Sequence, residues 1–166
     1  LATVGRVLLP EIDIFGTGPE IISRGITVAH VRELQAVLRR KPLIWDNLHA
    51  NDYDGRRFFC GPYNGRSPEL RSEVSGLLIN PNTEFSLNFV AVHTLAAFVG
   101  CSGTWDARQA YQAAMREWLP AFARWLNAPS PPQVSVEDVL RTNGADAVYY
   151  GTQMRGVSNA KAKREL

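Results

Sequence analysis

Short apolar runs alternate with segments of helical periodicity through the first hundred residues. Acidic and apolar side chains alternate over 11–15, which predicts a strand, and apolar runs at 43–45 and 76–79 predict two more. Each run is followed by a loop and by apolar positions at helical spacing. The predicted helices span 28–41, 68–74 and 84–99. A strand–loop–helix order that occurs three times is typical of βα units and predicts an α/β fold with a parallel sheet.

The pattern changes near residue 100. A glycine-containing linker at 100–103 and a capping Thr104 precede a long predicted helix, 105–127, and another helix begins at 136–140. Large apolar side chains recur on one face of the long helix. They are Trp105, Tyr111, Met115, Trp118, Leu119, Phe122 and Trp125. We interpret this face as a packing surface, the alternative being a stripe that binds a cofactor or nucleic acid.

The overall composition narrows the class of protein. Of the 166 residues, 45% are hydrophobic and 20% are charged, which is typical of a globular domain. A net charge of +2 is too small to indicate nucleic acid, and the longest apolar run, 89–99, is too short to span a bilayer. Cys60 and Cys101 lack metal-ligand spacing and are interpreted as ordinary buried thiols. We therefore expect no metal, no cofactor, and neither a nucleic-acid nor a membrane partner.

The most informative segment follows the second predicted strand directly. It begins with Trp45, and residues 46–54 include five Asn or Asp residues, which are poor formers of strands and helices. In α/β folds the carboxyl end of a strand is where ligands bind. An indole beside amides and carboxylates offers a sugar an apolar wall together with hydrogen-bonding groups for its hydroxyls. The pattern therefore predicts a carbohydrate site.

Two other loops lack residues that a calcium-binding or a nucleotide-binding motif requires. Placing Gly55 at the sixth position of a calcium-binding EF-hand loop puts Ala50 at the first and Gly61 at the twelfth, where Asp and Glu are required. The segment 16–21 has two of the glycines of a nucleotide-binding loop but lacks the third, and Pro19 removes a donor amide.

Several charged or polar residues near the predicted site favour structural roles. His49 is interpreted as a hydrogen-bonded structural histidine rather than a ligand or base. Arg56 and Arg66 are interpreted as structural or rim charges, and the roles of Asp46 and Asp54 stay open.

The motifs taken together resemble glycoside hydrolase family 84, the O-GlcNAcases and their bacterial relatives. The segments that carry the resemblance are 16–19, 45–54, 61–67, 80–82, 89–96 and 117–119. It is dense from residue 3 to about 100 and thinner to about 126. The resemblance implies a (β/α)8 TIM barrel followed by an α-helical domain. Residues 1–100 would supply the last three βα units of the barrel, and residues 101–166 the start of the helical region.

The resemblance also implies an enzymatic reaction. Members of this family hydrolyse terminal β-linked N-acetylglucosamine with retention of configuration, by substrate assistance. The acetamide oxygen of the sugar attacks the anomeric carbon to form an oxazoline, and two adjacent aspartates orient the acetamide and transfer protons. The substrate partner would be a glycoside or glycoprotein that bears N-acetylglucosamine.

The sequence departs from this family at the catalytic acids. No Asp-Asp pair occurs in the 166 residues, and Glu137-Asp138 is instead expected to open a helix, where acids favour the dipole. The chain is therefore expected to contain no catalytic residue. The acid pair would lie upstream, on an amino-terminal polypeptide that completes the barrel. The alternative is a non-catalytic carbohydrate-binding or scaffold protein derived from the same barrel.

Four residues are the predicted substrate-binding residues. The resemblance places Trp45 in the wall of the pocket for the acetamide methyl and Asn47 beside the acetamide. It places Asp52 at the 4- and 6-hydroxyls of the sugar, where an ionised carboxylate would accept strong hydrogen bonds, and Asn80 at the same end of the sugar. The structural alternatives are a core indole for Trp45, capping for Asn47 and Asp52, and a turn before Pro81 for Asn80.

Overall fold

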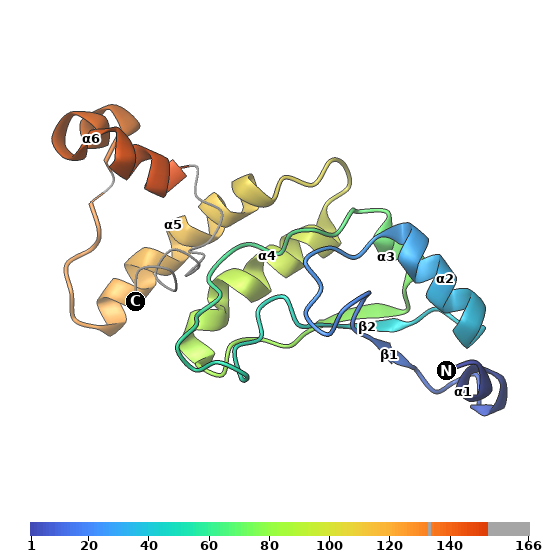
Figure 1. The fold of residues 1–166 in the computed structure, drawn as a ribbon. Helices are drawn as coiled ribbons and strands as arrows, with labels where there is room; N and C mark the ends of the chain where they lie inside the picture. Colours follow the sequence, from blue (N-terminus) through green and yellow to red (C-terminus); the bar gives the residue numbers. More distant parts are fainter. Residues whose placement is uncertain (133, 153–166) are drawn as a thin grey trace, which may run out of the picture. The chain divides into compact units, whose positions relative to one another are not determined.

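A three-stranded parallel sheet organises the first part of the chain (Figure 1). The structure is a computed structural model that describes residues 1–132 and 134–152. Strands β1 (Phe15–Gly16), β2 (Leu43–Asp46) and β3 (Gly76–Ile79) lie in the order β1-β2-β3. In the register, Ile44 of β2 pairs with Gly16 of β1 and with Leu77 of β3. The predicted parallel sheet is thus confirmed.

One helix precedes the first strand, and the other helices follow the strands. They are α1 (Ala2–Val7), α2 (Val28–Leu38), α3 (Leu70–Glu73), the 3-10 helix η1 (Phe85–Asn88), α4 (Phe89–Gly100), α5 (Ala107–Trp125) and α6 (Val136–Thr152). The chain divides into two compact units, 1–115 and 116–166, and the sheet belongs to the first. The predicted division into regions 1–100 and 101–166 remains a prediction.

The prediction is wrong at the amino-terminal end, where 11–15 was expected to form a strand. Only Phe15 and Gly16 form β1, and the helix α1 in front of it was not predicted. The reason is a long-range contact that alternation does not reveal. The guanidinium of Arg40 donates hydrogen bonds to the carbonyl oxygens of Leu9 and Ile12, at 2.6 and 3.0 Å, and holds this segment as an irregular connection.

Helix α2 begins as predicted and ends earlier than predicted. The hydroxyl of Thr27 accepts a hydrogen bond from the backbone N–H of His30 at 3.2 Å, which caps the amino end. Arg39 has a left-handed backbone, with φ of 58°, so the helix stops at Leu38. Arg39, Arg40 and Lys41, which the predicted range 28–41 includes, therefore lie outside the helix, and Arg40 donates hydrogen bonds to the segment before β1.

The two faces of the sheet differ in cover. The core on one face contains Ile26, Val31, Ile44, Leu70 and Val74. The opposite face carries Phe15, Trp45 and Leu78, which are 57%, 38% and 42% exposed. Successive side chains of a strand point to opposite faces of the sheet, so the residues next to the buried ones in each strand form this bare face. Parallel sheets are normally covered on both faces, and the described residues of the first unit cover this sheet on one.

The aromatic face of α5 is only partly buried. Trp105, just before the helix, packs edge-on against Phe98 with ring centroids 5.4 Å apart, which confirms its packing role. Phe122 stacks on Trp118, but Trp125 is 69% exposed even though its ring lies 5.7 Å from that of Phe122. The packing interpretation is therefore wrong for most of the Trp125 surface. Further along, Gly144, with φ of 81°, interrupts α6.

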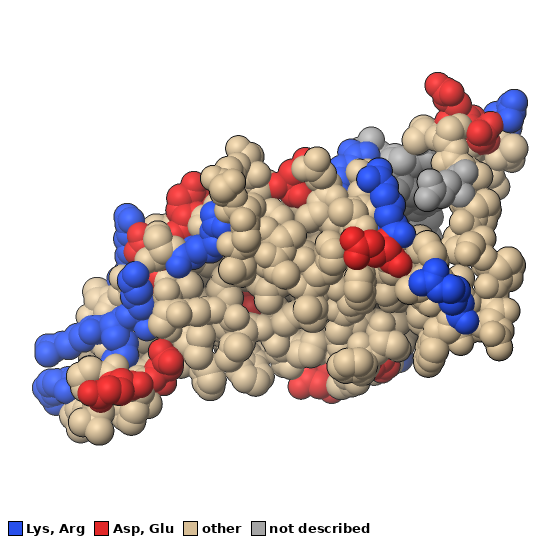
Figure 2. Space-filling model, turned by 180° about the vertical axis from the view of Figure 1, so that it is seen from behind, with Lys and Arg blue, Asp and Glu red and all other residues tan. Residues whose placement is uncertain are grey.

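Charged side chains are mixed in sign on the molecular surface. Figure 2 shows lysine and arginine side chains gathered toward the end that carries α1, with acidic side chains among them and uncharged surface between the groups. The exposed lysine and arginine residues of α1, α2 and the segment after α2 include Arg6, Arg32, Arg39 and Lys41. Within 1–132 and 134–152, no helix is both long and apolar enough to cross a membrane.

Candidate functional site

The loops that follow the three strands converge because the strands are parallel. The carboxyl ends of parallel strands lie at the same edge of a sheet, which places residues 17–26, 47–69 and 80–84 on one side of the molecule. The loop after β2 is the longest and reaches both others through side-chain hydrogen bonds. The polar residues predicted as a site all lie at this edge or in these loops.

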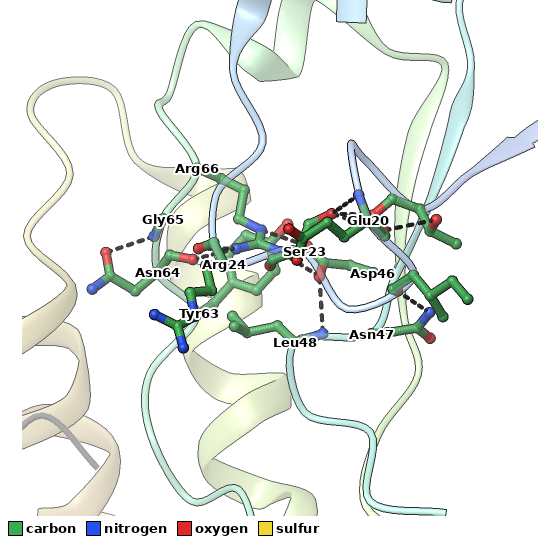
Figure 3. Close-up of polar contacts among 12 residues, drawn as sticks. Glu20, Ser23, Arg24, Asp46, Asn47, Leu48, Tyr63, Asn64, Gly65 and Arg66 are labelled. Carbon is green, nitrogen blue, oxygen red and sulfur yellow. Dashed lines mark hydrogen bonds and ion pairs between the residues drawn. The ribbon is translucent and has the colours of Figure 1, made fainter. Parts of the chain in front are cut away.

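A buried ion pair lies under these loops (Figure 3). The carboxylate of Asp46, the last residue of β2, accepts hydrogen bonds from Nε and Nη2 of Arg66, both at 2.7 Å. It also accepts from the hydroxyl of Tyr63 at 2.9 Å and from the backbone N–H of Leu48 at 3.0 Å. Burial and the neighbouring Asp46 carboxylate raise the pKa of Tyr63, so its phenol remains a donor. All three side chains are almost completely buried, so Arg66 is structural as predicted but is not a rim charge.

Arg66 uses its remaining donors to join two further chain segments. Its Nη1 atom donates to the carbonyl oxygens of Arg24 and Asn64, at 3.1 and 2.8 Å, and its Nη2 atom donates to that of Ser23 at 2.9 Å. All five guanidinium N–H groups thereby have acceptors. Gly65 allows this approach, because its φ is 77° and a Cβ atom there would lie 2.3 Å from the carbonyl oxygen of Arg24.

Asn47 joins the ends of two strands above this ion pair. Its side-chain oxygen accepts hydrogen bonds from the indole N–H of Trp45 at 3.0 Å and from the amide of Asn80 at 3.1 Å. Its amide donates to the carbonyl oxygen of Ile21 in the loop after β1, at 2.7 Å. Three of the four predicted substrate-binding residues, Trp45, Asn47 and Asn80, are therefore assembled into one cluster.

Asp52, the fourth predicted residue, does not join that cluster. It is exposed, and among the residues described by the structure it makes no hydrogen bond or ion pair. The nearby Asp54 pairs with Arg56 at 3.0 Å, and this contact lowers the pKa of the Asp54 carboxyl. Asp52 thus presents an uncommitted carboxylate at the same edge of the sheet.

Sequence reasoning missed two structural asparagines. Asn51 is fully buried, donates to Arg57 and Glu84, and accepts from the backbone and hydroxyl of Thr83. This places Asn51 between the loops after β2 and β3. Asn82 is also buried and exchanges two hydrogen bonds with the backbone of Phe59, at 2.9 and 3.1 Å. Only the crowding of asparagines in the sequence signalled them, and crowding does not separate structural from ligand-binding amides.

His49 is a structural histidine, as predicted. Its Nε2 atom lies 3.0 Å from the carbonyl oxygen of Gly61, which makes Nε2 the protonated nitrogen. Burial is the main cause that lowers the pKa of His49. Cys60 and Cys101 are half-buried rather than fully buried, and partial burial raises the pKa of the Cys60 thiol.

Within the ranges 1–132 and 134–152, the remaining acidic residues are not grouped as a metal centre requires. Among the described residues there is no group of three or more His, Cys, Asp or Glu side chains placed to hold a metal ion. Glu137 and Asp138 lie in the first turn of α6, as predicted, and Asp138 binds Ser135 and Arg141.

Comparison with known proteins decides the family. The profile of the beta-N-acetylglucosaminidase family matches residues 1–127. The chain belongs to this family. The resemblance carried by the motifs is thereby confirmed.

Relatives within the beta-N-acetylglucosaminidase family include Protein O-GlcNAcase of Rattus norvegicus and of Mus musculus. Each is 52% identical to this chain over 98 residues, which is 59% of this chain and 11% of the relative. The chain therefore spans only a small part of these proteins. A solved structure of an O-GlcNAc hydrolase mutant from Thermobaculum terrenum is 23% identical, with a TM-score of 0.67 over 90% of this chain and 36% of that one. At this identity the likeness supports the α/β fold alone.

Proposed function

We propose that this chain is the sugar-binding part of a retaining β-N-acetylglucosaminidase that hydrolyses terminal O-linked N-acetylglucosamine. The observation that carries the proposal is the cluster in which Asn47 binds both the indole of Trp45 and the amide of Asn80 at the carboxyl edge of a parallel sheet. An indole fixed beside two amides suits a ligand that has both an apolar methyl group and polar hydroxyl and amide groups.

Each residue has a separate task in this proposal. Trp45 forms one wall of the pocket for the acetamide methyl, and its 38% exposure leaves indole surface for that contact. Asn47 binds beside the acetamide, and Asn80 binds the end of the sugar that carries the 4- and 6-hydroxyls. Asp52 accepts hydrogen bonds from sugar hydroxyls, and its exposed carboxylate suits this task.

The proton chemistry of the proposed reaction belongs to residues outside this chain. In substrate-assisted hydrolysis the acetamide oxygen attacks the anomeric carbon, the glycosidic bond breaks, and a general acid protonates the leaving oxygen. Water then opens the oxazoline with the same group acting as base. No two adjacent aspartates occur in the 166 residues, so we place the acid pair upstream. The chain itself binds and orients the sugar.

The bare face of the sheet supports a partner that completes the barrel. Phe15, Trp45 and Leu78 would face the interior of a (β/α)8 barrel in which this chain supplies the last three βα units. The partner in this proposal is an amino-terminal polypeptide that carries the other strands. It would cover the apolar face and pair with the free edges of β1 and β3.

The test is hydrolysis of an aryl N-acetylglucosaminide by the complete barrel. We expect the wild-type protein to be active and Asp52→Ala to lose about 2–4 kcal/mol of transition-state binding, read from kcat/KM. Asp54→Ala is the matched control, since Asp54 is an acid two residues away that already pairs with Arg56. Near-normal activity of Asp52→Ala would contradict the assignment of Asp52.

The same experiment separates catalysis from binding alone. A complete barrel that binds N-acetylglucosamine but hydrolyses nothing would favour a non-catalytic carbohydrate-binding or scaffold protein. A protein that neither binds nor hydrolyses such a glycoside would contradict the proposed function as a whole.

A further inference from the structure

We infer that the buried Asp46–Arg66–Tyr63 network positions Trp45 and Asn47, and thereby sets which N-acyl group the sugar site accepts. The inference rests on the proposed function, because it concerns the pocket for the acetamide. None of the three network residues was assigned a role in binding. They are positioning residues, since they act through the backbone that carries the two binding residues.

The position of Asp46 in the chain gives the first argument. Asp46 lies between Trp45 and Asn47, and side chains alternate along β2, so its carboxylate points away from the face that carries Trp45. The same carboxylate accepts from the backbone N–H of Leu48, two residues later, at 3.0 Å. This contact is a local side-chain turn that sets the direction of the chain at Asn47. Rotation of the Asp46 side chain would therefore release the peptide group between Asn47 and Leu48.

The partners of Asp46 give the second argument. Arg66 approaches the carboxylate with two parallel N–H donors at 2.7 Å, which is a fixed planar geometry. The hydroxyl of Tyr63, in the loop after β2, adds a third donor at 2.9 Å from the Asp46 carboxylate. With Leu48, four hydrogen bonds hold one carboxylate that is completely buried. No rotation is possible without breaking several of these contacts.

The loop after β1 gives the third argument, because it contacts both the network and the site. Arg66 donates to the carbonyl oxygen of Ser23, and Asn47 donates to that of Ile21, two residues before it. Figure 3 shows the Ser23 segment beside Asp46, with the Arg66 side chain reaching toward both from the loop after β2. A shift of Arg66 would thus move the acceptor that orients the Asn47 amide. The network and the site share one piece of backbone.

The test uses two variants in the complete barrel. Tyr63→Phe removes one hydrogen bond and keeps the ion pair. Arg66→Lys keeps a positive charge but removes the planar pair of donors. Each variant is assayed on two aryl glycosides that differ only in the acyl group on nitrogen, acetyl or the longer butanoyl. The control is Arg32→Gln, which removes an exposed ion pair with Glu73 on the helices.

We expect the network variants to lower kcat/KM for the N-acetyl substrate by about tenfold or more, since small displacements of positioning groups have effects of this size. The ratio of kcat/KM for the butanoyl substrate to that for the acetyl substrate should rise several-fold, because Trp45 is no longer held in place. Arg32→Gln should leave the ratio unchanged. A merely structural role lowers the amount of folded enzyme and affects both substrates equally, so an unchanged ratio in both network variants would overturn the inference.

A second measurement keeps the inference separate from the proposed function. The indole N–H signal of Trp45, assigned by nuclear magnetic resonance with the Trp45→Phe variant, reports its bond to Asn47 without any substrate. We expect Tyr63→Phe to shift this signal and Arg32→Gln to leave it in place. If the wild-type barrel is inactive, the proposed function fails, and a shifted signal still supports positioning by the network. An unshifted indole signal in Tyr63→Phe would overturn the inference that the network positions Trp45, whether or not the barrel is an active hydrolase.

Discussion

The two ends of the polar segment 46–54 differ in what their side chains contact. At the inner end, Asp46 and Asn51 are completely buried, and every polar atom of their side chains has a partner in the protein. At the outer end, Asp52 is exposed without a partner among the described residues, and Asp54 holds only the exposed Arg56. Similar residue types therefore serve two purposes within nine positions.

This difference separates residues that stabilise the fold from residues that remain able to bind a ligand. A buried carboxylate or amide whose hydrogen bonds are complete has no capacity left for a ligand, and its loss leaves unsatisfied groups in the protein. An exposed carboxylate without partners keeps its capacity for a ligand, and its loss has little effect on the fold. Variants at the inner end should therefore reduce stability, and variants at the outer end should not.

The largest effect is expected at Asp46. Asp46→Asn removes the charge that compensates Arg66, and breaking a buried ion pair by removing one partner destabilises a protein by about 3–5 kcal/mol. The measurement is the free energy of unfolding from urea denaturation. A loss below 1 kcal/mol, on the order of an exposed ion pair, would show that the inner end is not supporting the fold.

A smaller loss of stability is expected at Asn51. Asn51→Ala leaves the backbone N–H of Thr83 and the carbonyl oxygen of Arg57 without their partner, which costs about 1–3 kcal/mol. The same urea titration measures it. Asp52→Ala, one position along, is the matched comparison, and equal destabilisation by both variants would remove the distinction between the two ends.

The pH dependence of stability provides a third comparison at His49. Burial lowers the pKa of folded His49 below its ordinary 6.5, so the unfolded chain binds a proton at a higher pH than the folded protein does. The His49 contribution is complete above pH 6.5 and is lost as the pH falls through the lowered pKa. His49→Gln keeps an N–H donor and should lose less stability than the wild type between about pH 7.5 and pH 5.5. Equal losses would show that His49 is not buried as a neutral ring.

The smallest effect is expected at the outer ion pair. Arg56→Gln removes the partner of Asp54, and the Arg56 side chain is 85% exposed, so the unfolding free energy should barely change. The pKa of Asp54, followed by nuclear magnetic resonance, should rise toward its ordinary value because Arg56 is the cause that lowers it. A large loss of stability here would contradict the assignment of the outer end to the surface.

Local patterns predicted most of the elements in the sheet. The apolar runs identified β2 and β3, and the helical spacing from residue 28 identified the start of α2, because these features depend on neighbouring residues. The expected strand at 11–15 and the missed α1 depend instead on Arg40, which is about thirty positions away in sequence. No local pattern contains that contact.

The site was predictable as a region but not in its internal division. Clustering of Trp45 with Asn and Asp residues indicated the right edge of the sheet, and the structure joins Trp45, Asn47 and Asn80 there. Whether a given Asp is buried is decided by a partner elsewhere in the chain. Asp46 is buried because Arg66, twenty residues later, reaches it. The sequence alone contains no sign of that pairing.

The arrangement around Arg66 has a consequence for the order of folding. Its contacts join segments that are 20 and 43 residues apart, so they form only after β2 and the loops after β1 and β2 have come together. We therefore expect the ion pair to be absent from the transition state for folding. Its loss should then speed unfolding and leave the folding rate nearly unchanged. In this protein the lifetime of the folded state, more than the speed of reaching it, depends on one guanidinium group.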